Sequence, residues 1–454
     1  MSDDAGARRD ERRVLWVTSA GHLLSHLYML VFPALVSPIR AELGLDLRAA
    51  LDLSFPGYLL YGLGALPAGY LTDRWQARGM LAIGMAASGA GAVAAGLART
   101  PGGLMAALAA VGLGASVYHP TGMSLLSRTF VGNRGRALGL NGVFGNVGIA
   151  GAPFLAGLLG AIWGWRVAFV ALGVPGLVAG LVTAFSPIDE RRAEGPSREQ
   201  PSAPGAAAAR APAPGTGGGR DVPATSEWRV RYFALLCAAM TLGGLVYTGA
   251  SALLPTYFEA RATFLGPVVA AVQAAGLHLT GAKTLAATTL TSLVYVVGIA
   301  GQLLGGYVAD RRDLRLGYLA FHAATIPALF AMSRLAEVPL FVAAFSYTLF
   351  GLGMQPIENS LVAKLTPAAW RSTAYGLKFI LTFGVGAAAV GLAGRIQERL
   401  GLPAVFAVMA AAAGLLVALA FALWVVSRRA LPALRNEHEA RGSTGMAPEG
   451  AAVS

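Results

Sequence analysis

The chain has 454 residues, of which 55% are hydrophobic and 13% charged, and its formal net charge is +12. A soluble domain carries about 25% charged residues, so this composition argues against a soluble protein. The basic residues lie in short clusters between apolar stretches, without interleaved aromatic residues, which argues against nucleic-acid binding. A single cysteine, Cys237, excludes an internal disulfide and a multi-cysteine metal site.

Apolar stretches of 18 or more residues without charge recur along the chain, and each is long enough to cross a bilayer as a helix. The first stretch is too long for a signal-peptide core and lacks a convincing cleavage site, so we expect it to be retained. The sequence predicts an all-α polytopic membrane protein. The expected helices are 14–37, 51–71, 80–98, 102–127, 137–162, 167–185, 230–255, 285–307, 316–334, 339–363, 373–394 and 404–426.

A segment rich in Pro, Ala, Gly and charge separates the sixth helix from the seventh. Such a composition cannot bury a core and predicts a flexible linker. The expected organisation is an N-terminal tail at 1–13, a six-helix bundle at 14–185, the linker at 186–229, a second six-helix bundle at 230–427 and a C-terminal tail at 428–454.

The distribution of Lys and Arg predicts how the helices are oriented in the membrane. If the N-terminus is cytoplasmic, about 25 of the 35 basic residues fall in cytoplasmic loops and tails, against about nine on the other side. Cytoplasmic loops of membrane proteins carry this excess of positive charge. We therefore expect both termini and the linker to be cytoplasmic, and the protein to lie in a bacterial inner membrane.

The two halves of the chain repeat one another. "GYLTDR" ends at Arg74 and "GYVADR" ends at Arg311, each with a second Arg four residues later, and the offset is 237 residues. The same offset relates Arg134, Gly139 and Asn141 to Arg371, Gly376 and Lys378. Such an internal repeat predicts two pseudo-symmetric six-helix bundles in parallel orientation, an arrangement known among transporters.

The repeated turns carry candidate gating residues. Asp73 and Asp310 are expected at helix C-termini, where the helix dipole disfavours an acid, so each needs a cationic partner or the N-terminus of another helix. Such a contact can form in one conformation and break in another, as a gate requires. The alternative is ordinary loop charge of the kind that sets topology. The candidate partners are Arg74, Arg78, Arg311 and Arg315.

These features resemble the major facilitator superfamily. The resemblance rests on the Gly-x-x-x-Asp-Arg turns after helices two and eight, the twelve helices and the central linker, and it covers about residues 14 to 427. It implies alternating access to a central site, with helices one, four, seven and ten lining the cavity. "YHPTGMSLLSR" and "GRALGLNGVFGNVG" look most like fosmidomycin-resistance-type efflux proteins of this superfamily.

The expected fifth helix is similar to the fifth-helix pattern of the superfamily's proton-driven antiporters. Alanine replaces glycine there twice, at Ala152 and Ala156, and small residues for close packing plus a proline kink are the alternative interpretation. Leu108 stands where many of these antiporters have an arginine, so a proton-relay role for that arginine is not carried over. The residues that match the pattern are Gly139, Gly148, Pro153 and Gly157.

Titratable side chains inside the expected helices are candidates for function, because a charge in hydrocarbon costs at least a few kcal/mol. His22 and His26 are four residues apart, on one face of the first helix, and His119 lies in the fourth. Glu358 and Lys378, in helices ten and eleven, both lie about 10 Å from the cytoplasmic edge at 1.5 Å per residue.

Each candidate also has a purely structural interpretation. Glu358 and Lys378 can form an ion pair that only holds the second bundle together. The histidines can simply donate hydrogen bonds to backbone carbonyls of a neighbouring helix. Tyr247 and Gln355 are further candidates for lining the cavity, whereas the resemblance places His322 in the outer scaffold.

Together these observations predict a secondary active transporter that exports a small organic compound or drug in exchange for protons. The alternative is a proton-coupled symporter or facilitator that takes up a small metabolite anion. Glu358 is the expected proton carrier unless Lys378 holds it ionised, in which case His22 or His119 takes that role. We expect no enzymatic activity, no metal and no cofactor besides the coupling proton. The expected partners are the substrate and the lipid bilayer, with a monomer as the functional unit.

Overall fold

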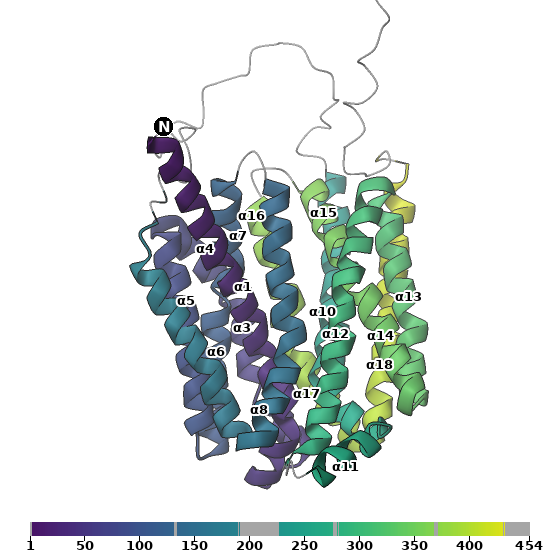
Figure 1. The fold of residues 1–454 in the computed structure, drawn as a ribbon. Coiled ribbons are helices and arrows are strands. Elements are labelled where there is room, and N and C mark those ends of the chain that lie inside the picture. Colours follow the sequence, from purple (N-terminus) through teal and green to yellow (C-terminus); the bar gives the residue numbers. More distant parts are fainter. Residues whose placement is uncertain are drawn as a thin grey trace, which may run out of the picture.

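The computed structural model describes residues 2–130, 134–188, 190, 227–275, 279, 281–366, 371–429 and 431, and all regular secondary structure in these ranges is helical. Most of the predicted linker (186–229) and of the C-terminal tail (428–454) lies outside the described residues. The helices form two groups that stand side by side, one from each half of the chain (Figure 1). This architecture confirms the predicted fold class.

Ten described helical stretches are long and apolar enough to cross a membrane. One of them, Arg136–Ala184, contains two crossing segments, because its helix turns back at Gly164. The second expected crossing segment is divided among three short helices and is therefore absent from those ten. With these two additions, the structure accounts for the twelve predicted segments.

The first half is broken into short helices where glycine and proline interrupt the backbone ladder. The second crossing segment bends at Gly64, and Pro56 occupies the first turn of the helix before it. Proline lacks an N–H donor and is tolerated best in the first turn of a helix, which favours the start of a new helix at Pro56. The helices are α1 (Ser2–Leu43), α2 (Leu47–Asp52), α3 (Phe55–Leu63), α4 (Ala65–Arg74), α5 (Ala77–Leu97), α6 (Pro101–Ala115), α7 (Tyr118–Thr129) and α8 (Arg134–Phe185).

The second half follows the same plan, and Pro356 in the first turn of its helix marks the break in the tenth crossing segment. The eleventh segment contains a five-residue π-helix, η3 (Ile380–Gly384), and the sequence did not predict it. The helices are α10 (Glu227–Arg261), α11 (Gly266–Ala274), α12 (Ala282–Arg311), α13 (Leu314–Arg334), α14 (Glu337–Gly353), α15 (Gln355–Leu365), α16 (Arg371–Phe379), α17 (Ala387–Leu400) and α18 (Leu402–Ser427).

The backbone itself repeats at the offset seen in the sequence. Gly164 joins the two arms of α8 at φ 84° and ψ 158°, and Gly401 joins α17 to α18 at φ 84° and ψ 164°. Glycine is the residue that adopts a positive φ without steric cost. These two turns are 237 residues apart, so they connect the fifth crossing segment to the sixth in each half.

We call the side of the bundle where α1 begins and α18 ends the tail side, and the opposite side the far side; they are the upper and lower sides in Figure 1. On the far side an ion pair joins the halves, since Arg48 Nη1 lies 2.7 Å from Glu398 Oε2. Deeper in the bundle, a Cβ placed on Gly62 would collide with the backbone of Gly384 in η3. The two halves therefore approach backbone to backbone at the π-helix.

The glycines of the antiporter-like pattern differ in what surrounds them. A Cβ on Gly148 would collide with the backbone of Leu23 in α1, and one on Gly157 would collide with the side chain of Thr288 in α12. A Cβ on Gly139 would meet open space. Two of the three glycines thus permit close helix contact, which is the packing interpretation of this pattern.

Candidate functional site

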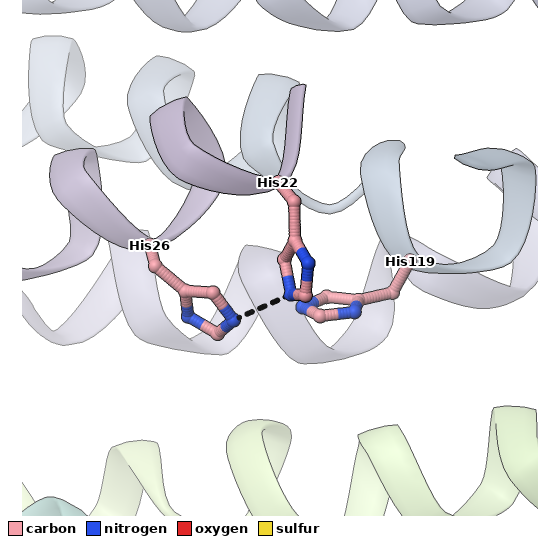
Figure 2. A group of neighbouring side chains, drawn as sticks. All are labelled: His22, His26 and His119. Carbon is pink, nitrogen blue, oxygen red and sulfur yellow. Dashed lines mark hydrogen bonds between the residues drawn. The ribbon is translucent and has the colours of Figure 1, made fainter. Parts of the chain in front are cut away.

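Three histidines from two helices of the first half lie together (Figure 2). His22 and His26 extend from α1 and His119 from α7, and their ring centroids are 4.9 to 5.4 Å apart. The Nε2 atoms of His22 and His26 are only 3.2 Å apart. We call these three residues the histidine cluster. The sequence predicted that they line one cavity, and the structure places them in mutual contact.

The ring of His22 is fixed by neighbours from α7 and α8. Its Nδ1 lies 2.9 Å from both the backbone oxygen and the side-chain Oδ1 of Asn141. The Tyr118 hydroxyl donates to the same Oδ1 at 2.6 Å, and the Tyr118 ring stacks on His22 with centroids 4.7 Å apart. A Cβ on Gly145 would lie 2.5 Å from His22 Nε2, so this position has room only for glycine.

The histidine cluster faces the second half of the chain. The ring of His119 stacks on Phe379 of α16 with centroids 4.6 Å apart. His119 Nε2 also forms a hydrogen bond of 3.0 Å with the hydroxyl of Tyr61. The ring of Tyr61 in turn packs against Phe383 of η3. Phe379 of the second half therefore covers His119, and Phe383 covers its hydrogen-bond partner Tyr61.

Glu358 and Lys378 form a buried ion pair in the second half. Lys378 Nζ lies 2.8 Å from Glu358 Oε1, and the two side chains are 9% and 2% exposed. The Tyr318 hydroxyl donates to Glu358 Oε2 at 2.9 Å, and Lys378 Nζ also donates to Asn359 Oδ1 at 2.6 Å. Both charges that the sequence placed at one depth are thus paired and further hydrogen-bonded, as a buried ion pair requires.

His322 belongs to the surroundings of this ion pair. Its ring packs against Tyr318 with centroids 4.5 Å apart, and it lies on α13, buried. The scaffold role that the family resemblance implies for His322 stays a prediction.

The other predicted cavity residues lie in two further groups. Gln355 accepts a hydrogen bond from Gln302 at 3.2 Å, and Gln302 accepts one from Asn146 of α8 at 2.9 Å, so this chain of amides crosses from one half to the other. Tyr247 lines a small cavity of about 10 Å³ together with Tyr295 and other residues of the second half. Neither group contacts the histidine cluster directly among the described hydrogen bonds.

The predicted gating residues differ in their contacts, and the side chain of Asp73 lies outside the described residues. The guanidinium of Arg74 lies 3.5 Å from the ring centre of Tyr70, and that of Arg311 lies 4.0 Å from Tyr307. These cation–π contacts repeat at the 237-residue offset. Asp310 is exposed.

The two remaining arginines of the turns hold their own halves together. Arg78 Nη1 donates to the Ser186 carbonyl at 2.7 Å, and the backbone N–H of Arg78 donates to Glu190 at 2.7 Å. Arg315 is buried and pairs with Asp313 at 2.6 Å. A gating role for the turns stays a prediction.

Several residues of the site were missed from the sequence. Asn141 had been noted only as the repeat partner of Lys378, and Tyr118 occupies the position equivalent to Gln355. Lys378 and Gln355 are both candidate residues of the second half, so the offset could have identified Asn141 and Tyr118. No comparable signal pointed to Phe379, because an aromatic residue in an apolar helix is ordinary.

The repeated bundles, the buried titratable groups between them and the matched turns define a membrane transporter built from two similar halves. A family model described as Major Facilitator Superfamily matches residues 18–377. This chain belongs to that superfamily.

Curated relatives share parts of the chain. The probable L-galactonate transporter of Escherichia coli (strain K12) is 27% identical over 278 residues, which are 60% of this chain and 55% of that protein. The fosmidomycin resistance protein of Escherichia coli (strain K12) is 29% identical over 33% of this chain and 37% of its own length. The multidrug resistance protein Stp of Mycobacterium tuberculosis (strain CDC 1551 / Oshkosh) is 33% identical over 28% of this chain and 25% of its own length. The chain spans about half or less of the length of these relatives.

Solved structures share the fold over nearly the whole chain. A peptide transporter POT in complex with sulfate has a TM-score of 0.66 at 16% identity, covering 92% of this chain and 94% of that one. A similar TM-score of 0.65, at 17% identity, relates the chain to a bacterial homologue of the human lysosomal transporter Spinster in an inward-facing, occupied conformation. That match covers 94% of this chain and 98% of the other. At these identities the likeness concerns the fold alone.

Proposed function

We propose that this transporter exports a small organic compound or drug from a bacterial cell in exchange for protons, by alternating access across the inner membrane. In this proposal the tail side is cytoplasmic, the chain works as a monomer, and it performs no catalysis. Four kinds of resistance protein occur among the relatives, acting by their names on fosmidomycin, several drugs, methylenomycin A and puromycin, and they support export.

The ion pair of Glu358 and Lys378 is the observation that carries proton coupling in this proposal. The pair is neutral. A proton added to Glu358 leaves one net positive charge, and a monovalent cation bound to the intact pair leaves the same charge. Because excess buried charge is costly, the proton and a cationic substrate exclude one another. Mutual exclusion at one site is what exchange requires.

The same pair supports a second function, the proton-coupled uptake of a metabolite anion. Protonation of Glu358 frees Lys378 to bind an anion, and the complex with proton and anion together is neutral. The proton and the substrate then travel in the same direction. The probable L-galactonate transporter among the relatives favours this alternative. In this scheme the sign of the substrate's charge decides between exchange and co-transport.

Alternating access requires the contacts between the halves to separate in turn. On the far side these are the ion pair of Arg48 and Glu398 and the close approach of Gly157 to Thr288. Elsewhere they are the amide chain from Asn146 to Gln302 and the stacking of Phe379 on His119. Few of these contacts are charged, so rocking of the halves faces small electrostatic barriers.

The test uses everted vesicles that contain the protein and hold a preset acidic interior, with a fluorescent reporter of internal pH. A panel of cationic, neutral and anionic compounds is added outside. Exchange raises the internal pH when a substrate enters, whereas co-transport of an anion lowers it further. We expect Glu358→Gln to abolish either response and Glu337→Gln, at the start of α14 on the far side, to retain it. A full response in Glu358→Gln vesicles would remove the ion pair from the coupling step.

A further inference from the structure

We propose that His22, His26 and His119 form a binding site for a divalent transition-metal ion of the class of Zn²⁺, Co²⁺ or Ni²⁺. Each residue offers one ring nitrogen, and the three nitrogens lie within 4.8 Å of one another. Figure 2 shows the three rings converging from two helices on one point. This site lies in the first half and is separate from the ion pair assigned to proton coupling.

The spacing of the nitrogens fits a metal ion. Imidazole nitrogens bind Zn²⁺ at about 2.0–2.1 Å, so two ligands of a tetrahedral ion are about 3.3 Å apart. The Nε2 atoms of His22 and His26 are 3.2 Å apart. A small movement of His119 toward this pair completes a three-ligand set.

The surroundings of His22 prepare its Nε2 to act as a ligand. Both atoms within 2.9 Å of its Nδ1 are oxygens of Asn141, which accept hydrogen bonds, so we assign the ring proton to Nδ1. Nε2 then carries a lone pair, which in this structure accepts the Nε2–H of His26. Transfer of that proton to Nδ1 of His26 leaves both Nε2 lone pairs available to a metal ion. Histidines that bind metal ions generally donate their other N–H to a carbonyl or carboxylate in this way, which fixes both the tautomer and the ring.

His119 can join the set if its hydrogen-bond partner turns away. Its Nε2 is bonded to the Tyr61 hydroxyl at 3.0 Å, and Ser25 Oγ lies 3.4 Å from the same hydroxyl. Coordination through Nε2 therefore leaves Tyr61 an alternative partner. Three protein ligands leave one position of a tetrahedral ion for water or for a donor atom of a transported compound.

The donor set determines which ions bind. Neutral imidazole suits zinc, copper, nickel and iron, whereas Mg²⁺ and Ca²⁺ prefer oxygen ligands. The ion would lie beneath Phe379 and Phe383 of the second half, so separation of the halves would open a path to it.

The experiment measures binding to the full chain purified in detergent, without a polyhistidine tag and with His278 and His438 replaced by alanine to remove background ligands. Equilibrium dialysis with Zn²⁺ and the visible absorption of bound Co²⁺ give stoichiometry and coordination. We expect one tight ion per chain. His22→Ala and His26→Ala should each weaken binding at least about tenfold, as even loss of an outer partner does, and His322→Ala should leave it unchanged.

Two further variants keep the test decisive if an alanine variant unfolds. Gly145→Ala pushes on His22 Nε2 without removing a ligand and should weaken binding, while the protein still elutes as a single species. Glu358→Gln should bind the metal normally even where proton-coupled transport is lost, which separates this site from the proposed function. Equal metal binding by the starting protein and by a folded variant lacking all three histidines would overturn the proposal.

Discussion

The two halves of this transporter place different chemistry at equivalent positions. Asn141 in the first half is a neutral amide that fixes His22, whereas Lys378, at the same place in the second half, is a charge that pairs with Glu358. The first half therefore surrounds its titratable groups with uncharged polar partners, whereas the second half holds a compensated pair of charges. A duplicated bundle thus keeps its backbone while the side chains at equivalent positions diverge.

The largest expected effect comes from breaking the charge compensation. Lys378→Met leaves the buried Glu358 without its partner, and loss of one member of a buried pair costs about 3–5 kcal/mol. The double variant Glu358→Gln/Lys378→Met should recover most of this loss, because no charge stays buried. Chemical unfolding in detergent measures both. If Lys378→Met is as stable as the double variant, Lys378 does not compensate the charge of Glu358.

Two tyrosines allow the strength of the polar contacts in the two halves to be compared. Tyr318 donates to the charged Glu358, and Tyr118 donates to the neutral Asn141. Hydrogen bonds to charged groups contribute about 1.5–3 kcal/mol and neutral ones about 0.5–1.5 kcal/mol. Tyr318→Phe should therefore lower the free energy of unfolding more than Tyr118→Phe. The reverse order would show that the first site is the more strongly polar of the two.

The smallest expected effect concerns the far-side contact that joins the halves. Arg48 and Glu398 are both about half exposed, and exposed ion pairs contribute little to the free energy of unfolding. The Glu398 carboxylate raises the pKa of the Arg48 guanidinium, because the hydrogen bond and the opposite charge favour the protonated form. Arg48→Gln should hardly change unfolding but should shift the balance between the two access states.

Cysteine labelling of the far side, with and without added salt, measures this shift in the access states. Salt should reproduce part of the effect of Arg48→Gln in the unmodified protein, since screening weakens exposed pairs. A large loss of stability in Arg48→Gln would mean that the far-side contact is structural rather than a latch.

The number of crossing segments, the duplication and the titratable residues inside the membrane could all be predicted from the sequence. These features are local or periodic: apolar length defines a span, and a fixed offset defines a repeat. The shared depth of Glu358 and Lys378 also followed from the rise per residue, which is why their pairing was among the predicted alternatives.

Which side chains come into contact depends on the tertiary structure. Each residue turns a helix by about 100°, so small differences in helix rotation and tilt decide whether His119 points at His22 or into lipid. The π-helix and the close approach of Gly62 to Gly384 set how near the two halves come. Likewise, the partner of Arg48 lies 350 residues away on another helix. Contacts of this kind depend on the packing of whole helices, and no local pattern of residues encodes them.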